Sequence, residues 1–155
     1  MKQNKTKRRY AEKVLNEIKI KLPSLSVNEG MARAAVSAFC AQLDPAPSEL
    51  ADIKCAVSEA VTNCIVHAYK ECIGCIYITV RLCENRLVKI EIKDKGCGIE
   101  NVEIARQPLY TTDAENERSG MGFTVMESFC DKVRVLSGCK KGTTVTLFKY
   151  LKRRE

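Results

Sequence analysis

The sequence predicts an α+β fold, a two-layer α/β sandwich in which helices cover one face of a mostly antiparallel sheet. Three observations predict this fold. Short runs of alternating apolar and polar residues are typical of half-buried strands, longer apolar segments have the length of helices, and the elements follow one another as strand, two helices, hairpin, loop, helix and hairpin. The 155 residues suffice for one domain with a single core.

The first expected elements are a strand and a helix. Apolar and charged residues alternate over residues 16–22, and Pro23 ends this strand. Ser26 and Glu29 have the spacing of a capping box, which predicts a helix from there to about Leu43.

The expected first helix carries a single charge, Arg33, between Met31 and Leu43. A helix that is apolar on nearly all sides has to be covered on more than one side. Two interpretations stay open. Either the helix is simply well buried, or its outer side contacts a partner protein or a second subunit, with Arg33 as the charged feature of that surface.

The rest of the chain combines clear elements with one long loop. Ser48 has the position of an N-cap for the second helix. The polar segment 99–119 is long for a loop inside a compact domain, so we expect a lid or binding loop there. The other expected elements are the second helix to about Tyr69, a hairpin of strands 76–83 and 87–93, a helix at 122–129, and a hairpin of strands 132–137 and 143–150.

Charge is spread unevenly along the chain, whose formal net charge is +7. Residues 1–21 hold eight basic and two acidic residues, whereas the remaining 134 hold eighteen basic and seventeen acidic ones. We therefore expect a basic, disordered extension at 1–15, a domain at 16–151 and a basic tail at 152–155. Because the domain itself is nearly neutral, direct nucleic-acid binding is not expected.

Composition also bears on the compartment. No apolar run approaches the roughly 18 residues of a membrane span, and the basic N-terminus lacks the apolar stretch of a signal peptide, so we expect a cytoplasmic protein without membrane contact. The nine cysteines are scattered and odd in number. We expect them to be reduced, with four of them as small core residues: Cys40, Cys55, Cys64 and Cys83.

Three polar side chains, Glu59, Asn63 and His67, stand four residues apart in the otherwise apolar second helix. At about 100° per residue they project from one helix face. Burying them costs about several kcal/mol unless a polar group meets them, so a ligand is expected there. The amide oxygen of Asn63 together with triphosphate oxygens would suffice for Mg²⁺, and Glu59 can accept a proton from a hydroxyl or water. His67 is interpreted as structural.

Asp94 ends an expected strand and opens a DxGxG segment with Gly96 and Gly98. A carboxylate at this place can accept a hydrogen bond from an exocyclic amine such as that of adenine. The two glycines allow the backbone to approach a flat ring. The same pattern also describes an ordinary turn.

A glycine-flanked helix start follows the long loop. Its free N–H groups can bind phosphate, and Arg118 can neutralise a terminal phosphate, although a plain N-cap with flexible glycines has the same pattern. Thr143 begins the last strand, where its hydroxyl either reaches a base or is simply that of a strand residue. The chain has neither a P-loop nor a Rossmann motif. The residues of the helix start are Ser119, Gly120, Met121 and Gly122.

Taken together, ExxxN on a helix, DxGxG, a lid, GxG at a helix start and a late Gly-Thr resemble the GHKL superfamily of ATP-binding domains, with its Bergerat-type fold. Segments 57–63, 105–112 and 117–123 closely resemble the sporulation anti-sigma F factors, and the similarity spans residues 16–151. One departure, the His-Ala-Tyr sequence at 67–69, is closer to the stress-response anti-sigma B kinases.

The resemblance implies a role for each matched residue. Glu59 would be the general base and Asn63 would hold Mg²⁺. Asp94 would bind the adenine amine, in a base pocket lined by Gly96 and Gly98 and assisted by Thr143. Residues 104–118 would form the ATP lid. The implied phosphate and lid contacts are Thr111, Thr112, Arg118, Ser119, Gly120, Met121 and Gly122.

The resemblance further implies an ATP-dependent serine protein kinase that doubles as an anti-sigma factor. A homodimer would hold a sporulation sigma factor away from RNA polymerase and phosphorylate an anti-anti-sigma protein on serine. Two alternatives stay open: a nucleotide-gated sigma-binding module without significant kinase activity, and a kinase of the stress-response anti-sigma B type. A solitary histidine-kinase ATP domain is disfavoured, because the chain has no room for a phospho-acceptor helix pair.

Overall fold

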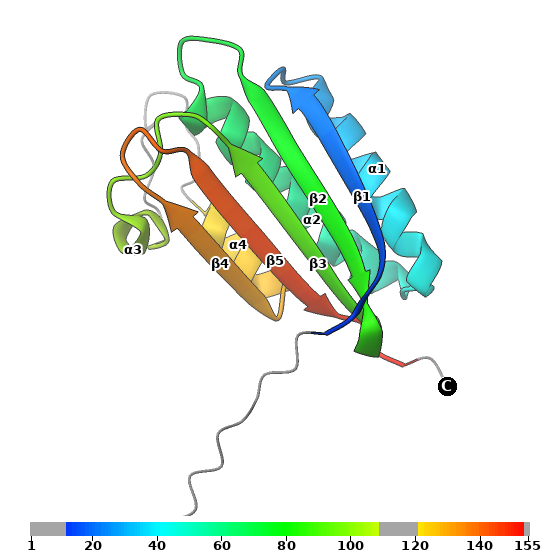
Figure 1. Ribbon diagram of the computed structural model, residues 1–155. Helices are drawn as coiled ribbons and strands as arrows, with labels where there is room; N and C mark the ends of the chain where they lie inside the picture. The colour runs from blue at the N-terminus through cyan, green and yellow to red at the C-terminus, as the bar shows by residue number, and fades with distance from the viewer. Residues whose placement is uncertain (1–11, 109–120, 154–155) are drawn as a thin grey trace, which may run out of the picture.

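Five strands form one sheet in the computed structural model, which describes residues 12–108 and 121–153. Their order across the sheet is β1-β2-β3-β5-β4, and each neighbouring pair is antiparallel (Figure 1). The two hairpins therefore lie side by side, with β1 and β4 at the edges. The strands are β1 (Val14–Pro23), β2 (Cys75–Cys83), β3 (Leu87–Asp94), β4 (Lys132–Ser137) and β5 (Thr143–Tyr150).

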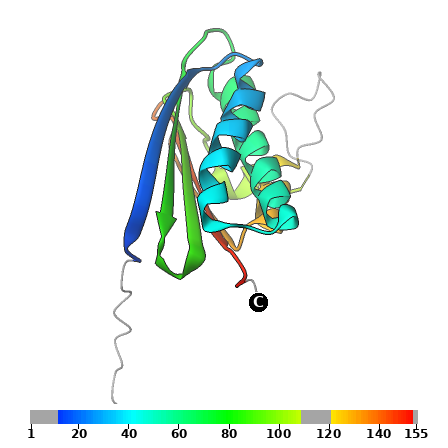
Figure 2. The ribbon, with the colours of Figure 1, turned by 90° about the vertical axis from the view of Figure 1, so that its right-hand side faces the viewer.

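Helices cover one face of this sheet, while the described residues place no helix over the other face (Figure 2). The predicted two-layer α+β sandwich is confirmed. The helices are α1 (Asn28–Cys40), α2 (Pro47–Asn63), α3 (Val102–Ala105) and α4 (Gly122–Phe129). The 3₁₀ turn η1 (Ala41–Leu43) follows α1, the π-helical turn η2 (Cys64–Ala68) follows α2, and the 3₁₀ turn η3 (Glu84–Arg86) joins β2 to β3.

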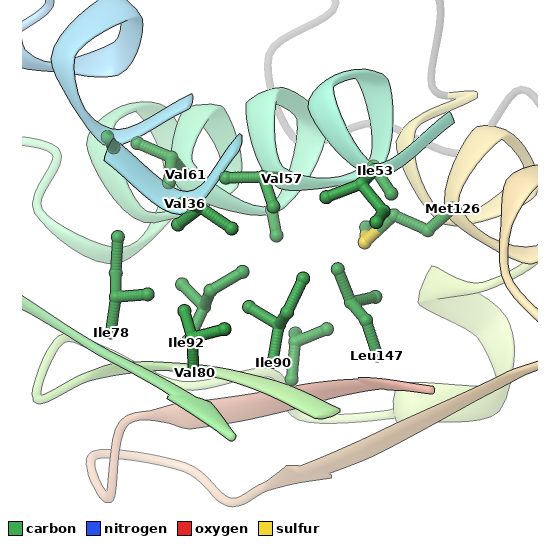
Figure 3. Packing of buried hydrophobic residues seen from close by; sticks show 14 of the residues in the cluster. Val36, Ile53, Val57, Val61, Ile78, Val80, Ile90, Ile92, Met126 and Leu147 are labelled. Carbon is green, nitrogen blue, oxygen red and sulfur yellow. The ribbon is translucent and has the colours of Figure 1, made fainter. Parts of the chain in front are cut away.

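The core lies between the two layers. Because side chains alternate along a strand, β2 and β3 each direct every second residue toward the helices, and the isoleucines and valines at these places are fully buried. Figure 3 shows Ile78, Val80, Ile90 and Ile92 opposite Val57 and Val61 of α2, with Met126 of α4 at one end of the cluster. Burying each such side chain contributes about 1.5–3 kcal/mol, which fixes α2 on the sheet.

The helix starts differ from the predicted caps. Val27, not Ser26, is the N-cap of α1 and makes no side-chain capping bond, so the predicted capping box is wrong. Helix α2 begins at Pro47 with Ala46 as N-cap, and Ser48 lies inside it. The reason is Glu49, whose Oε2 accepts the Ala46 N–H at 2.9 Å. Its Oε1 accepts the Lys152 N–H at 2.7 Å, which ties the end of the sheet to this helix.

The start of the first strand also differs. Strand β1 begins at Val14, before the expected strand start at residue 16, and the Lys13 carbonyl accepts the Glu84 N–H at 2.9 Å. The expected extension and tail otherwise fall on residues 1–11 and 154–155, outside the described residues. Strands β4 and β5 and helix α4 have the predicted bounds.

The first helix is not buried on all sides within the chain. Ala32, Val36 and Cys40 of α1 are buried against the core, but Met31 is 60% exposed and the preceding Val27 is 81% exposed. The interpretation of α1 as simply a well-buried helix is therefore wrong, and its outer side is accessible.

All nine cysteines are free thiols. Cys40, Cys64 and Cys83 are buried as predicted, whereas Cys55 is exposed, because it lies on the outer side of α2. Burial raises the pKa of the Cys40 thiol to about 12. Among the described residues, no helix is both long and apolar enough to cross a membrane.

Candidate nucleotide-binding site

A cavity of about 1030 Å³ opens between the end of α2, the end of β3 and the start of α4. It is the place where the predicted motifs meet, although they are far apart in the sequence. Seven predicted site residues line it: Glu59, Asn63, Asp94, Gly98, Met121, Gly122 and Thr143.

Glu59, Asn63 and His67 all line this cavity from one helical surface. The i, i+4, i+8 spacing therefore predicted their common orientation correctly. The α-helix ends at Asn63, however, and His67 lies in the π-helical turn η2. Such turns insert an extra residue per turn and are frequent at functional sites.

The turn η2 packs directly against the backbone of the DxGxG segment. The Ala68 carbonyl accepts the Cys97 N–H at 3.1 Å, and a β-carbon on Gly96 would lie 2.3 Å from the same oxygen. No side chain fits at Gly96. Tyr69 reinforces the junction, because its hydroxyl donates to the Cys75 carbonyl and accepts the Lys95 N–H, each at 2.7 Å. Gly96 thus serves this junction and is not itself part of the cavity wall.

Asp94 is 4% exposed and is held by the backbone. Its Oδ1 accepts the Gly96 N–H at 2.9 Å and the Thr143 N–H at 3.1 Å, so neither backbone bond uses Oδ2. Burial raises the pKa of this carboxyl, while these bonds and one from the Cys64 thiol act in the opposite direction. The result is a fixed hydrogen-bond acceptor at the inner end of the cavity, as recognition of an exocyclic amine requires.

Thr143 is positioned by Ser137. Ser137 Oγ accepts the Ile99 N–H at 2.7 Å, lies 3.0 Å from the Gly142 carbonyl and 2.7 Å from Thr143 Oγ1. Ser137 has one proton, so when it donates to Gly142 the Thr143 hydroxyl donates to Ser137. The lone pairs of Thr143 are then available to a ligand.

Gly98 and Gly142 shape the two loops that meet beside Asp94. Both have positive φ, 75° and 74°, which a side chain disfavours. A β-carbon on Gly98 would lie 1.9 Å from the Gly138 carbonyl oxygen, and one on Gly142 would lie 2.3 Å from the Asp94 carbonyl oxygen. These loops pack backbone against backbone.

The start of α4 closes the cavity opposite α2. Met121 and Gly122 line it, and a β-carbon on Gly122 would lie 3.3 Å from both Asn63 Oδ1 and Glu59 Oε2. The positive end of the α4 dipole therefore faces the acidic wall of α2. Five predicted residues lie outside the described residues: Thr111, Thr112, Arg118, Ser119 and Gly120.

The entry to the expected lid is anchored. Asn101 caps α3 through Oδ1, which accepts the Ile104 N–H at 3.1 Å. Arg106 forms an ion pair with Glu127 of α4, with Nε 2.8 Å from Oε1. Of the expected lid at 104–118, only 104–108 are described.

Arg33 lies apart from this cavity, on the exposed side of α1. Its Nη1 is 3.3 Å from Glu29 Oε1 and 3.3 Å from Ser58 Oγ of α2. The described geometry thus does not bring Arg33 together with the other predicted residues.

Two residues of the site were missed from the sequence. The Cys64 thiol forms a hydrogen bond with the Asp94 carboxylate, and Ser137 positions the Thr143 hydroxyl. Cys64 follows Asn63 directly in an apolar run, and Ser137 ends a strand, so neither has a spacing that marks it.

Comparison with known proteins agrees with this geometry. The family model described as "Histidine kinase-like ATPase domain" matches residues 22–149. An anti-sigma F factor of Caldanaerobacter subterraneus subsp. tengcongensis is 54% identical over 138 residues, 89% of this chain and 96% of that protein. An anti-sigma F factor of Bacillus thuringiensis is 54% identical over 137 residues, 88% of this chain and 93% of that protein.

Solved structures show the same fold. The structure of the RsbU and RsbW domains of Rv1364c from Mycobacterium tuberculosis superposes with a TM-score of 0.66 at 24% identity, over 90% of this chain and 33% of that one. The histidine kinase domain of the blue-light activated histidine kinase of Erythrobacter litoralis gives 0.53 at 17% identity, over 79% and 61%.

The sandwich and its cavity define a histidine kinase-like ATPase domain, a class whose description names ATP as the nucleotide. Within this class, the sequence is 54% identical to the two anti-sigma F factors over nearly their full length. The chain belongs to the anti-sigma F factor family.

Proposed function

We propose that this protein is an ATP-dependent serine protein kinase that also sequesters a sporulation sigma factor in the cytoplasm. One observation carries the proposal: Glu59 and Asn63, one helical turn apart, line the cavity wall against the first residue of α4. The names of the anti-sigma F relatives support the sigma-binding part, and they favour the anti-sigma F type over the stress-response anti-sigma B type.

The proposed reaction transfers the γ-phosphoryl group of ATP to a serine of an anti-anti-sigma protein. The serine oxygen forms a bond to the γ-phosphorus, the bond from this phosphorus to the bridging oxygen breaks, and ADP leaves with the electron pair. Glu59 takes the serine proton. Phosphoryl transfer depends mainly on positioning and charge neutralisation, so a small set of side chains suffices.

The residues at the cavity wall fit a magnesium ion. The carboxylate of Glu59 and the amide oxygen of Asn63 approach the same point beside Gly122, and Mg²⁺ prefers oxygen ligands. We assign Asn63 as the ligand, since Glu59 has to accept a proton. When bound, the ion would neutralise charge on the phosphate oxygens.

The remaining predicted contacts follow from this placement. Asp94 and Thr143 would hold the adenine, between loops that Gly96 and Gly98 allow to pack closely. The start of α4 at Met121 and Gly122 would direct N–H groups toward the phosphates. The contacts assigned to Thr111, Thr112, Arg118, Ser119 and Gly120 remain proposals.

The outer side of α1 is the proposed partner surface. Val27 and Met31 expose apolar area there, and Arg33 adds a charge. Arg33 contacts Ser58, which precedes Glu59 in α2, so the partner surface and the cavity share one helix. We propose that this surface serves the sigma factor and a second subunit.

The test is transfer of label from γ-labelled Mg-ATP to the anti-anti-sigma protein of the same organism, followed by phosphoamino acid analysis. We expect phosphoserine, with transfer lost in Glu59→Gln. Calorimetry with and without Mg²⁺ should show that Asn63→Ala loses the magnesium-dependent part of ATP affinity.

A different result would support the alternative function. If ATP binds and the sigma factor is retained, but no phosphoserine forms under any condition, the protein is a nucleotide-gated sigma-binding module. Label on histidine would instead contradict the serine assignment.

A further inference from the structure

The open face of the sheet concentrates positive charge. On this face, which Figure 1 views directly, the outward positions of the five strands hold seven basic side chains and two acidic ones, Glu17 and Glu91. The rest of the described chain holds twelve basic and thirteen acidic residues. The near-neutral sum over the domain therefore conceals a strongly basic face.

The basic residues form two rows with an aromatic ring in the middle of each. Lys21, Tyr77 and Lys93 are paired in register across β1, β2 and β3. Lys89, Phe148 and Lys132 are paired in register across β3, β5 and β4. The rows lie four residues apart along β3, about 13 Å at the rise of a strand.

Cations border both rings. Lys21 and Lys95 lie 5.8 and 5.1 Å from the centroid of Tyr77. Around Phe148, the distances are 5.6 Å for Lys89, 5.8 Å for Lys132 and 5.5 Å for Arg134. Among the described residues, none of the three cations around Phe148 forms an ion pair.

Such a cluster is unfavourable without an anion. Like charges gathered on one sheet face repel one another. Each cation–π contact at an exposed site offsets only about 0.5–1 kcal/mol of this repulsion. Of the two carboxylates on this face, Glu17 already pairs with Arg81 at 2.6 Å and Lys19 at 3.6 Å. A polyanion lying across β3 would neutralise both rows at once.

We infer that the open face of the sheet binds single-stranded nucleic acid. An acidic polypeptide would neutralise the cations but would leave the two aromatic rings without a partner. Single-stranded nucleic acid satisfies the cations with phosphates and also uses the two aromatic rings, since bases stack on aromatic side chains of an open sheet. This function is separate from the cavity, which opens between the end of α2, the end of β3 and the start of α4.

The experiment is fluorescence anisotropy of the full-length protein with labelled U12 and dT12 oligonucleotides at 50 to 200 mM salt, without nucleotide. Lys89→Gln/Arg134→Gln should weaken binding and flatten the slope of log affinity against log salt by about 1.4, since each phosphate contact contributes roughly 0.7 on single strands. Phe148→Leu should weaken binding at least about fivefold, because it removes one stacking platform.

Three controls make the result decisive. Lys54→Gln/Lys141→Gln removes two exposed charges that belong to neither row, one on α2 and one in the turn between β4 and β5, and should leave affinity within about twofold. A full-length variant with Gln at Lys5, Lys7, Arg8 and Arg9 measures what the basic N-terminal segment contributes. Thermal unfolding of each variant with ATP confirms that the fold and the cavity are intact.

The outcomes separate cleanly. Losses in both sheet variants, with the Lys54→Gln/Lys141→Gln control unchanged, support the inference, and comparing U12 with dT12 tells RNA from DNA. Loss confined to the N-terminal variant would overturn it. A labelled oligoglutamate that binds as tightly as U12, with no effect of Phe148→Leu, would also overturn it and assign the face to an acidic protein. No binding at 50 mM salt would overturn it as well.

Discussion

A β-carbon on Gly122, the first residue of α4, would lie 3.3 Å from the amide oxygen of Asn63 on α2. The same atom would lie 3.3 Å from Glu59 Oε2. Helix α4 therefore approaches the proposed metal ligand and the proposed general base as closely as a glycine permits. The positive helix end at this place favours the phosphates of a nucleotide.

Gly122→Ala tests this approach. An alanine there would have to push the two side chains aside by a few tenths of an ångström, so we expect ATP affinity to fall about tenfold or more with little change in unfolding free energy. Calorimetric titration with Mg-ATP measures the affinity, and urea unfolding measures stability. Wild-type affinity in this variant would show that the close approach has no role in nucleotide binding.

Asp94→Asn tests recognition of the base. Asparagine keeps an oxygen for the Gly96 and Thr143 N–H groups but presents an NH₂ group where the carboxylate accepts a hydrogen bond, so donor would face donor. We expect at least about a tenfold loss of ATP affinity. An unchanged preference for ATP over GTP in this variant would contradict the assignment of Asp94 to the adenine amine.

The pH dependence of stability follows from the same residue. Burial raises the pKa of Asp94 in the folded protein above 3.8, so the folded state binds a proton that the unfolded state releases. The contribution of Asp94 to stability is therefore largest below the unfolded value and is lost as pH rises through the raised value. Comparing thermal unfolding of wild type and Asp94→Asn from pH 3.5 to 7 should show the variant gaining relative stability as pH rises. A constant difference would contradict the shift.

Gly96 offers a matched pair of substitutions. Gly96→Ala would place a β-carbon 2.3 Å from the Ala68 carbonyl oxygen, so the backbone has to move and we expect a loss of about 2 kcal/mol or more of unfolding free energy. Gly30→Ala, inside α1, meets only the Arg33 side chain at 3.8 Å and should stabilise by about 0.5–1 kcal/mol. Urea unfolding compares the two. Equal effects would mean that the Gly96 junction is not tightly packed.

Ser137→Ala probes one of the two site residues that the sequence did not reveal. The variant leaves the Ile99 N–H without its acceptor and frees the Thr143 hydroxyl to rotate. We expect a loss of about 1–3 kcal/mol of stability and weaker ATP binding. If Thr143→Val has the same effect on affinity and the double variant adds nothing further, Ser137 acts through Thr143; full additivity would contradict this.

Periodicity predicted the fold and the wall of the cavity, because both depend on repeated spacing. The alternation of β2 and β3 and the four-residue spacing of Glu59 and Asn63 appear directly in the sequence. The helix caps were less predictable: Ser48 has the right residue type, but α2 begins before it, where Glu49 accepts the Ala46 N–H. A capping residue competes with every neighbouring acceptor.

Contacts between distant segments could not be predicted from spacing. Ser137 Oγ accepts the N–H of Ile99, which lies 38 positions earlier, and the Cys64 thiol acts on Asp94, thirty positions on. The basic face also needs the sheet order, because Lys89 and Lys132 meet around Phe148 only when β5 lies between β3 and β4. The roles of residues 109–120 rest on resemblance alone.

The most direct test of the central claim is single-turnover phosphoryl transfer by wild type and Glu59→Gln at saturating Mg-ATP and anti-anti-sigma protein. Loss of a general base typically costs about 10²- to 10⁴-fold, so we predict a decrease of this size in the transfer rate, with ATP affinity within about threefold of wild type. A transfer rate in Glu59→Gln close to that of wild type would contradict the account.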